Sequence, residues 1–312
     1  MQPRSPRRFR AARCGGFAAA LLAAPLAATP FGPALVAVAA RAGDAAGPVW
    51  PEPDGTLVLA RPFGRSEISL RLARRVAGAV DTLTWDGVTF LADTEPADAL
   101  QARAALGSGS GRRRVSEAGG PQAAEPAARR LRALRSGRSW AETETRLAWD
   151  PPETGAAADV ILHKRVALGL PGLGNAVEVQ ARFVLPGPAA AARFEPLTLA
   201  VPAEFSEAWR FDPATGALSR RAAAPGEEPA PVVLATPEGS HALAVWSPDP
   251  PAQEPDAPRP RFTVRPGPGA TRLGCAVRIA EAAAGNHDFA CYALVGTLAD
   301  VRSALRTLTA PE

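Results

Sequence analysis

The sequence predicts an all-β protein, a large antiparallel β-sandwich with one C-terminal helix. Short runs with alternating polar and apolar residues recur along most of the chain, and turns rich in Gly, Pro, Asp and Asn separate them. Their spacing is close to the roughly 8–12 residues typical of sandwiches. No strand–helix–strand alternation is found, which argues against a parallel α/β sheet.

The first forty residues predict an export signal. Five arginines precede a charge-free run, from Cys14 to Ala40, that ends in small residues, and this is the order of a cleavable signal. A membrane anchor is the alternative, because such an anchor needs roughly 20 apolar residues, although prolines interrupt this run. Arg7-Arg8 also resembles a twin-arginine signal. We expect cleavage, a periplasmic or extracellular location, and no membrane contact afterwards.

The leader also dominates the charge balance. The chain has 35 basic and 31 acidic residues, but five arginines and no acids lie before Arg41, so 30 basic residues remain against 31 acidic ones. Nucleic-acid binding needs a concentrated positive surface and is not expected. The clusters 112–114 and 129–130 are arginines that we interpret as solvated charge at loops or strand edges.

A β-hairpin is the clearest local signal after the leader. Asp86-Gly87 separates two β-prone runs, 76–85 and 88–91. A two-residue type I′ turn needs positive φ at both central positions, which Asp and Gly tolerate.

The remaining pattern predicts one all-β domain over residues 41–312. Segments 107–128 and 248–260 are rich in small residues and proline, and they are expected to be surface loops inside that domain. Including the hairpin, strands are expected at 57–60, 66–72, 76–85, 88–91, 131–135, 140–149, 160–168, 177–185, 194–201, 232–235, 242–246, 261–264, 273–280 and 289–295.

The C-terminus predicts the single helix. Thr297 can cap it, and Asp300 can complete a capping box. An apolar stripe at helical spacing, which should pack on a sheet, consists of Leu298, Val301, Leu305 and Leu308.

The central hairpin, around the connection Gly169–Asn175, supplies the predicted ligand face. Pairing the apolar faces of its strands places Val166 opposite Val177 and Arg165 opposite Glu178. The other face is then either the solvated side of an antiparallel sheet or a sugar-binding surface. This polar strip consists of His163, Arg165, Glu178, Gln180 and Arg182.

Two further residues are candidate ligand contacts. Glu195 shares the period-2 face of Leu197 and Leu199, where a carboxylate is either functional or paired with Arg193. Trp209 lies beside a polar turn, where it could stack on a sugar ring. The three histidines lack metal-ligand spacing, so neither a metal site nor a cofactor is predicted, and no catalytic residue is identified.

Cys275 and Cys291 are the cysteines that remain after the leader, and in an exported chain they are a candidate disulfide. A hairpin centred on Ala283 would place them directly opposite one another, within the Cα separation of roughly 4.4–6.8 Å that a disulfide allows. Reduced cysteines buried as small apolar residues are the alternative. A one-residue slip in the turn would forbid the bond.

Several segments resemble a known fold family. GAVDTLTWDG at 78–87 is similar to the opening hairpin of galactose mutarotase-like (aldose 1-epimerase-like) proteins. Segments 160–186, 194–218, 231–251 and 291–305 resemble uncharacterised exported bacterial proteins associated with that fold. The resemblance implies a β-supersandwich and, by analogy, a carbohydrate ligand.

The catalytic pattern of that family is not matched. Mutarotases use a histidine in an Asn-His-x-Tyr-Phe-like motif before the chain midpoint, whereas the Asn286-His287 pair lies near the C-terminus. The uncharacterised group has an Asp-His-Gly-Arg-like stretch, and the corresponding segment 92–106 has no histidine.

Three function classes therefore remain open. The first expectation is an exported protein that binds or processes carbohydrate. The alternatives are a non-catalytic structural or interaction module of the cell envelope, and a mutarotase or polysaccharide-lyase-like enzyme. Acid–base catalysis needs positioned titratable pairs, and the sequence shows no recognisable ones.

Overall fold

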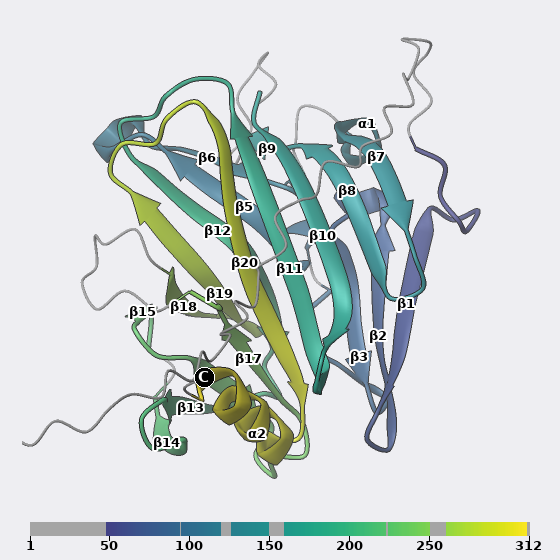
Figure 1. Cartoon of the computed structure of the whole chain (residues 1–312), viewed down its shortest axis with the longest axis vertical. Helices are drawn as coiled ribbons and strands as arrows, with labels where there is room; N and C mark the ends of the chain where they lie inside the picture. The colour runs from purple at the N-terminus through teal and green to yellow at the C-terminus, as the bar shows by residue number, and fades with distance from the viewer. Residues whose placement is uncertain are drawn as a thin grey trace, which may run out of the picture. The chain divides into compact units, whose positions relative to one another are not determined.

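In the computed structural model of the chain, the described residues form three antiparallel sheets (Figure 1). A four-stranded sheet has the order β1-β2-β3-β4, a nine-stranded sheet the order β14-β13-β16-β17-β20-β11-β10-β8-β7, and a seven-stranded sheet the order β15-β18-β19-β12-β5-β6-β9. The predicted all-β class is confirmed. The leader lies outside the described residues, which are 48–93, 95–119, 126–149, 159–222, 224–249 and 260–310.

The strands and helices have the following bounds: β1 Thr56–Phe63, β2 Ser66–Ala73, β3 Val80–Trp85, β4 Val88–Thr89, β5 Gln101–Leu106, β6 Arg113–Ser116, α1 Ala127–Arg130, β7 Leu131–Ser136, β8 Trp140–Arg146, β9 Ala148–Trp149, β10 Ile161–Leu170, β11 Leu173–Leu185, β12 Ala192–Pro202, β13 Glu207–Asp212, β14 Ala217–Arg221, β15 Gly226–Glu228, β16 Val232–Ala235, β17 Ala242–Trp246, β18 Pro260–Gly267, β19 Ala270–Ile279, β20 Gly285–Gly296 and α2 Leu298–Thr309.

The predicted hairpin turn is present, but its first strand is shorter than expected. Asp86 and Gly87 have φ values of 52° and 75°, as a type I′ turn requires. Upstream, Arg74–Val76 form a 3₁₀ turn and Ala77 has a φ of 57°. The strand therefore begins at Val80, because a left-handed residue interrupts extended backbone.

The predicted loop 107–128 contains a strand. β6 pairs with β5 on one side and β9 on the other, and neither β5 nor β6 was expected. Their sequences, QARAAL and RRVS, have few of the β-branched and aromatic residues that mark strands. β13, β14 and β15 were also missed. These segments are strands because they pair with neighbouring strands in a sheet, and not because their residues have a high β-propensity.

The predicted register of the central hairpin is wrong by two residues. Val166 pairs with Val179, not with Val177. The strands extend to Leu170 and Leu173, so the turn is shorter than the expected connection. Because the shift is even, every side chain keeps its expected face.

The predicted geometry of the cysteines is also wrong. Cys275 lies on β19 of the seven-stranded sheet and Cys291 on β20 of the nine-stranded sheet, and these strands do not pair with each other. The structure nevertheless joins the two residues in a disulfide, with a Cα–Cα distance of 6.8 Å. Both cysteines are buried. The bond therefore crosses the core between two sheets instead of bridging a hairpin.

The core also contains one buried ion pair. Lys164 lies on the inward face of β10, between Leu162 and Val166, and its Nζ contacts the carboxylate of Glu117, with both side chains 0% exposed. The second carboxylate oxygen of Glu117 accepts a hydrogen bond of 3.0 Å from the backbone N–H of Ala102. The pair connects β10 of one sheet to β5 and the end of β6 in the other.

Arg130 completes this polar cluster and is not solvated as expected. It is 2% exposed. Its guanidinium donates to the backbone carbonyls of Glu117 at 2.6 Å and Ala118 at 2.8 Å. A buried guanidinium needs such acceptors, because burial of an unbonded charge is very costly.

The predicted C-terminal helix is confirmed as α2. Thr297 and Asp300 form the expected capping box. Val301, Ala304 and Leu305 are buried against outward residues of the nine-stranded sheet, so α2 covers part of that face. No helix among the described residues is both long and apolar enough to cross a membrane.

Breaking the buried pair should strongly destabilise the fold. Lys164→Met leaves the Glu117 carboxylate uncompensated, and we expect the free energy of unfolding in urea to fall by about 3–5 kcal/mol. The matched control is Arg135→Met. The Arg135 side chain pairs with Glu142 and is 66% exposed, so its replacement should lower the free energy of unfolding by less than about 1 kcal/mol. Equal losses in the two variants would contradict the assigned role.

The disulfide is testable by mass. Denatured protein alkylated without reductant should carry two fewer alkyl groups than protein alkylated after reduction, because Cys275 and Cys291 are bonded. Replacement of both by alanine should lower the free energy of unfolding by about 2–5 kcal/mol. Equal masses with and without reductant would refute the bond.

Candidate functional site

The polar strip lies on the outward face of β10 and β11, in a register that differs from the expected one. Arg165 is opposite Gln180 instead of Glu178, and His163 is opposite Arg182. The side chains are half-buried. The structure therefore brings the five predicted residues together on one sheet face.

Polar contacts within and around the strip use much of its hydrogen-bonding capacity. Arg165 lies 3.4 Å from the carboxylate of Glu178, which also accepts a hydrogen bond of 2.9 Å from Gln180. Arg182 donates to Asp288 at 2.7 Å. The strip is thus a row of largely compensated charges.

Trp209 is separate from the strip. It lies on β13, which three strands, β16, β17 and β20, separate from β11 in the sheet order. Its indole lines a cavity of about 530 Å³ with Leu218, Leu298 and Arg302, and the guanidinium of Arg220 lies 5.1 Å from its ring centre. Trp209 and the strip cannot contact one small ligand together.

The predicted orientation of Glu195 is wrong. A β-bulge interrupts β12 between Phe194 and Leu197, and both of those side chains are fully buried. The extra residue puts Glu195 on the outward face instead of the face of Leu197. There it forms the expected pair with Arg193 and a second ion pair of 3.1 Å with Arg265.

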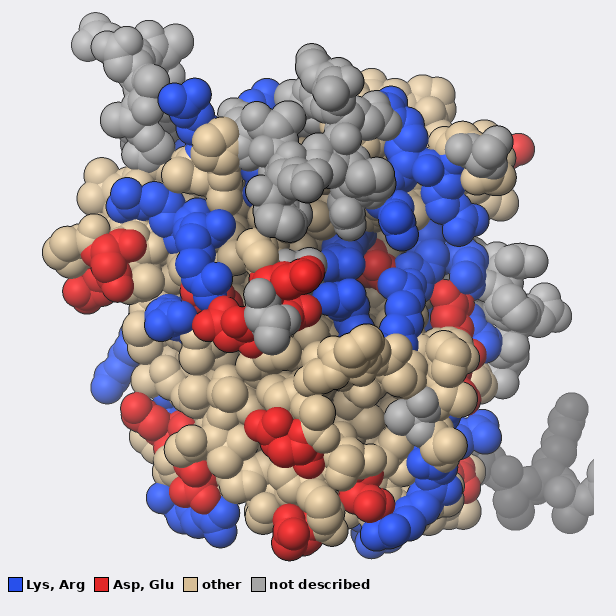
Figure 2. All heavy atoms as spheres, turned by 180° about the vertical axis from the view of Figure 1, so that it is seen from behind, with Lys and Arg blue, Asp and Glu red and all other residues tan. Residues whose placement is uncertain are grey.

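Glu195 belongs to a groove of about 830 Å³ on the outward face of the seven-stranded sheet. Seven arginines line this arginine groove, and Glu195 and Glu227 are its only described acids. Seen from behind in Figure 2, arginine side chains gather across the upper half of the view. The arginines are Arg103, Arg112, Arg113, Arg114, Arg193, Arg265 and Arg278.

One row of outward side chains crosses the floor of the groove. Arg278 on β19 is opposite Arg193 on β12, Arg193 is opposite Ala105 on β5, and Ala105 is opposite Arg114 on β6. The short side chain of Ala105 leaves a hollow between Arg193 and Arg114. Two strand spacings, about 9–10 Å, separate these arginines.

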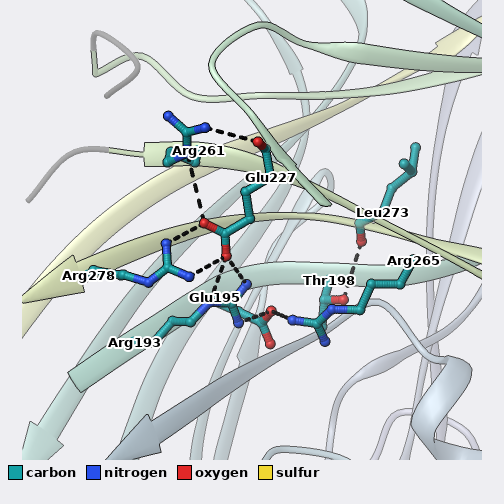
Figure 3. A network of polar contacts seen from close by, with 8 residues as sticks. All are labelled: Arg193, Glu195, Thr198, Glu227, Arg261, Arg265, Leu273 and Arg278. Carbon is teal, nitrogen blue, oxygen red and sulfur yellow. Dashed lines mark hydrogen bonds and ion pairs between the residues drawn. The ribbon is translucent and has the colours of Figure 1, made fainter. Parts of the chain in front are cut away.

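The carboxylate of Glu227 is in contact with arginines from three strands (Figure 3). Arg193 donates to its Oε1 from Nε at 3.1 Å and from Nη2 at 3.0 Å. Arg278 donates to Oε1 at 2.8 Å and also to Oε2. Arg261 lies 3.8 Å from Oε2 and donates to the backbone carbonyl of Glu227 at 2.9 Å.

These contacts set the protonation state of Glu227. Burial alone raises the pKa of its carboxyl, but the hydrogen bond from Arg278 and the charges of Arg193 and Arg278 outweigh burial and hold the pKa below its usual value. The carboxylate therefore stays ionised near neutral pH and is a poor proton donor. The described lining has no His, Cys, Tyr or Lys, and its many guanidinium groups suit the binding of anions.

The opposite wall of the groove consists of exposed arginines. Arg112 and Arg114 are exposed and form no ion pair with any residue that the structure describes. Arg113 stacks on the ring of Trp149, at 3.8 Å. The sequence gives one clue to this wall, the triplet 112–114, which we interpreted as solvated charge.

No metal site is formed in the described part of the chain. No group of three or more His, Cys, Asp or Glu residues there is arranged to hold a metal ion.

No family model matches the sequence, and no curated protein matches it. Among solved structures, the Slr1438 protein from Synechocystis sp. PCC 6803 is 12% identical, with 77% of this chain and 96% of that chain covered and a TM-score of 0.42. The GH36 alpha-galactosidase AgaB from Geobacillus stearothermophilus is 11% identical, with 81% and 42% covered and a TM-score of 0.47.

A Klebsiella pneumoniae protein, provisionally assigned as an aldose 1-epimerase, is 9% identical, with 81% and 90% covered and a TM-score of 0.38. This chain spans about two fifths of the length of the alpha-galactosidases. These matches are likenesses of fold at 9–12% sequence identity.

The Glu227 contacts predict a pH dependence. A carboxyl whose pKa is lower in the folded than in the unfolded chain, where it is about 4.3, stabilises the fold above that value. This stabilisation is lost as the pH falls through the folded-state pKa. Between pH 6 and pH 3, wild-type protein should therefore lose more unfolding free energy than Glu227→Gln. Parallel curves for the two proteins would contradict the lowered pKa.

Proposed function

We propose that this chain is an exported, non-catalytic protein that binds an acidic saccharide in the arginine groove. The observation that carries the proposal is the excess of seven arginines over two glutamates around one groove. Guanidinium groups bind the oxygens of carboxylates and sulfates through paired, charge-assisted hydrogen bonds. The groove therefore favours an anionic ligand over a neutral one.

The dimensions of the groove support a ligand with more than one sugar ring. Its volume of about 830 Å³ lies within the range of roughly 300–1,000 Å³ for small-ligand sites. Arg193 and Arg114 face each other across Ala105, at a spacing of about 9–10 Å. Anionic groups on separate rings of an oligosaccharide suit that spacing. The saccharide itself is supported by the sequence resemblance to galactose mutarotase-like proteins.

Export is part of the proposal. The basic and apolar leader of residues 1–40 supports it. A disulfide between Cys275 and Cys291 is also in keeping with an oxidising compartment.

A second candidate ligand face is the polar strip, and an aromatic pair beside it favours this alternative. Tyr292 is opposite Glu178 on the neighbouring strand. Its ring stacks on that of Trp246, with 5.5 Å between centres and 12° between planes. Aromatic rings next to amide and carboxylate groups suit a neutral sugar.

Binding to defined oligosaccharides tests the proposal. Trigalacturonate should bind the protein in isothermal titration calorimetry, an uncharged galactose trisaccharide should not, and added NaCl should weaken the binding. Arg114→Gln should lower the affinity at least about tenfold, because a hydrogen bond to a charged group contributes about 1.5–3 kcal/mol. The control is Arg132→Gln on the edge strand β7, which should leave the affinity unchanged.

Two outcomes would redirect the assignment. If the neutral trisaccharide binds and Arg165→Ala or Gln180→Ala abolishes that binding, the polar strip is the site. If trigalacturonate binds with equal affinity to wild type and Arg114→Gln, the arginine groove is not the site.

A further inference from the structure

The arginine groove contains a carboxylate receptor that is already occupied. We infer that Arg193 and Arg278 form the subsite for a carboxylate of the ligand, and that the Glu227 side chain fills this subsite in the free protein and swings out when ligand enters. The inference rests on the proposed function. It adds that the acidic group of the ligand is a carboxylate and that Glu227 competes with the ligand for the subsite.

The contacts of Glu227 are those of a bound ligand carboxylate. Arg278 donates to both of its oxygens, and Arg193 donates two hydrogen bonds of 3.0 and 3.1 Å to one of them. The two guanidiniums come from directly opposed positions on neighbouring strands. The bidentate contact of Arg278 with both oxygens matches the flat shape of a carboxylate, which a uronic acid shares with glutamate.

The fold holds the subsite arginines, Arg193 and Arg278, more firmly than it holds Glu227. Arg193 and Arg278 lie on β12 and β19, which have strands on both sides, whereas Glu227 lies on β15, a strand of three residues at the edge of the sheet. Its side chain is 19% exposed in the groove, so it has a path to solvent. The side chain can leave without the strand, because Arg261 holds the backbone carbonyl of Glu227 at 2.9 Å.

Glu195 is the natural comparison for Glu227. It also pairs with Arg193, but it lies on β12 itself and is only 8% exposed. Its place beside a bulge in a central strand gives it no comparable route out of the groove. Glu195→Gln therefore removes one negative charge from the same groove without vacating the Arg193–Arg278 subsite.

An internal competitor lowers the apparent affinity for the ligand by the fraction of molecules in which the subsite is open. Glu227→Gln removes the charge that holds the side chain on the arginines. It should raise the affinity for trigalacturonate at least about fivefold, and change the affinity for a carrageenan oligosaccharide, which is sulfated but has no carboxylate, by less than about twofold. Glu195→Gln should change the affinities for both probes by the same factor.

A measurement on wild-type protein complements the variants. The carboxyl carbon of Glu227, followed by NMR, should titrate with a lowered pKa in the free protein. With saturating trigalacturonate its resonance should shift to that of a solvent-exposed carboxylate. A resonance and titration that stay unchanged in the complex would overturn the inference, whether or not the variants fold.

The outcomes separate the inference from the function on which it rests. If wild type binds trigalacturonate through Arg114, but Glu227→Gln binds it equally or more weakly, the carboxylate subsite is refuted and the acidic-saccharide groove stands. If Glu227→Gln and Glu195→Gln strengthen binding of both probes equally, only net charge matters, and the subsite is again refuted. If no acidic probe binds any of these proteins, both proposals fail.

Discussion

The buried ion pair between Lys164 and Glu117 is the interaction that connects the interior of this protein to its candidate site. Two charges in a core are tolerated only when their remaining hydrogen-bonding groups are satisfied. Here the backbone N–H of Ala102 donates to the Glu117 carboxylate, and Arg130 donates to the backbone carbonyl of the same residue. Glu117 directly follows β6, and Ala102 lies on β5, so the pair fixes the two strands that carry one wall of the arginine groove.

The disulfide holds β19, which carries the Arg278 side of the groove, from inside the protein. Cys275 points into the core from β19 and is joined to β20 of the other sheet. Arg278, on the same strand, contributes to the outward groove. Strand alternation thus lets β19 hold two sheets together with one face while it presents a guanidinium on the other. The donors of the groove are therefore preorganised, which reduces the ordering cost of binding.

Charge distribution matters more here than net charge. Residues 41–312 contain 30 basic and 31 acidic residues, a balance that gave no reason to expect an anion site. Folding nevertheless gathers seven arginines and two glutamates around one groove, while acids elsewhere pair with arginines at the surface, as in the polar strip. The groove thus combines an ionised Glu227 with an excess of guanidinium groups, which suits the recognition of anions.

The sequence by itself determined the local features of this protein. The Asp86-Gly87 turn, the capping box of α2 and the inward face of β11 all depend on residues within a few positions of one another, so propensity and period-2 alternation predict them. Lys164 on an apolar face was also a readable signal, but its partner lies 47 residues away. Only the tertiary structure decided that partner, the hairpin register, the crossing of the disulfide and the arginine groove. Each of these depends on which strands become neighbours, and sheet order is set by the burial of whole faces, not by any short segment.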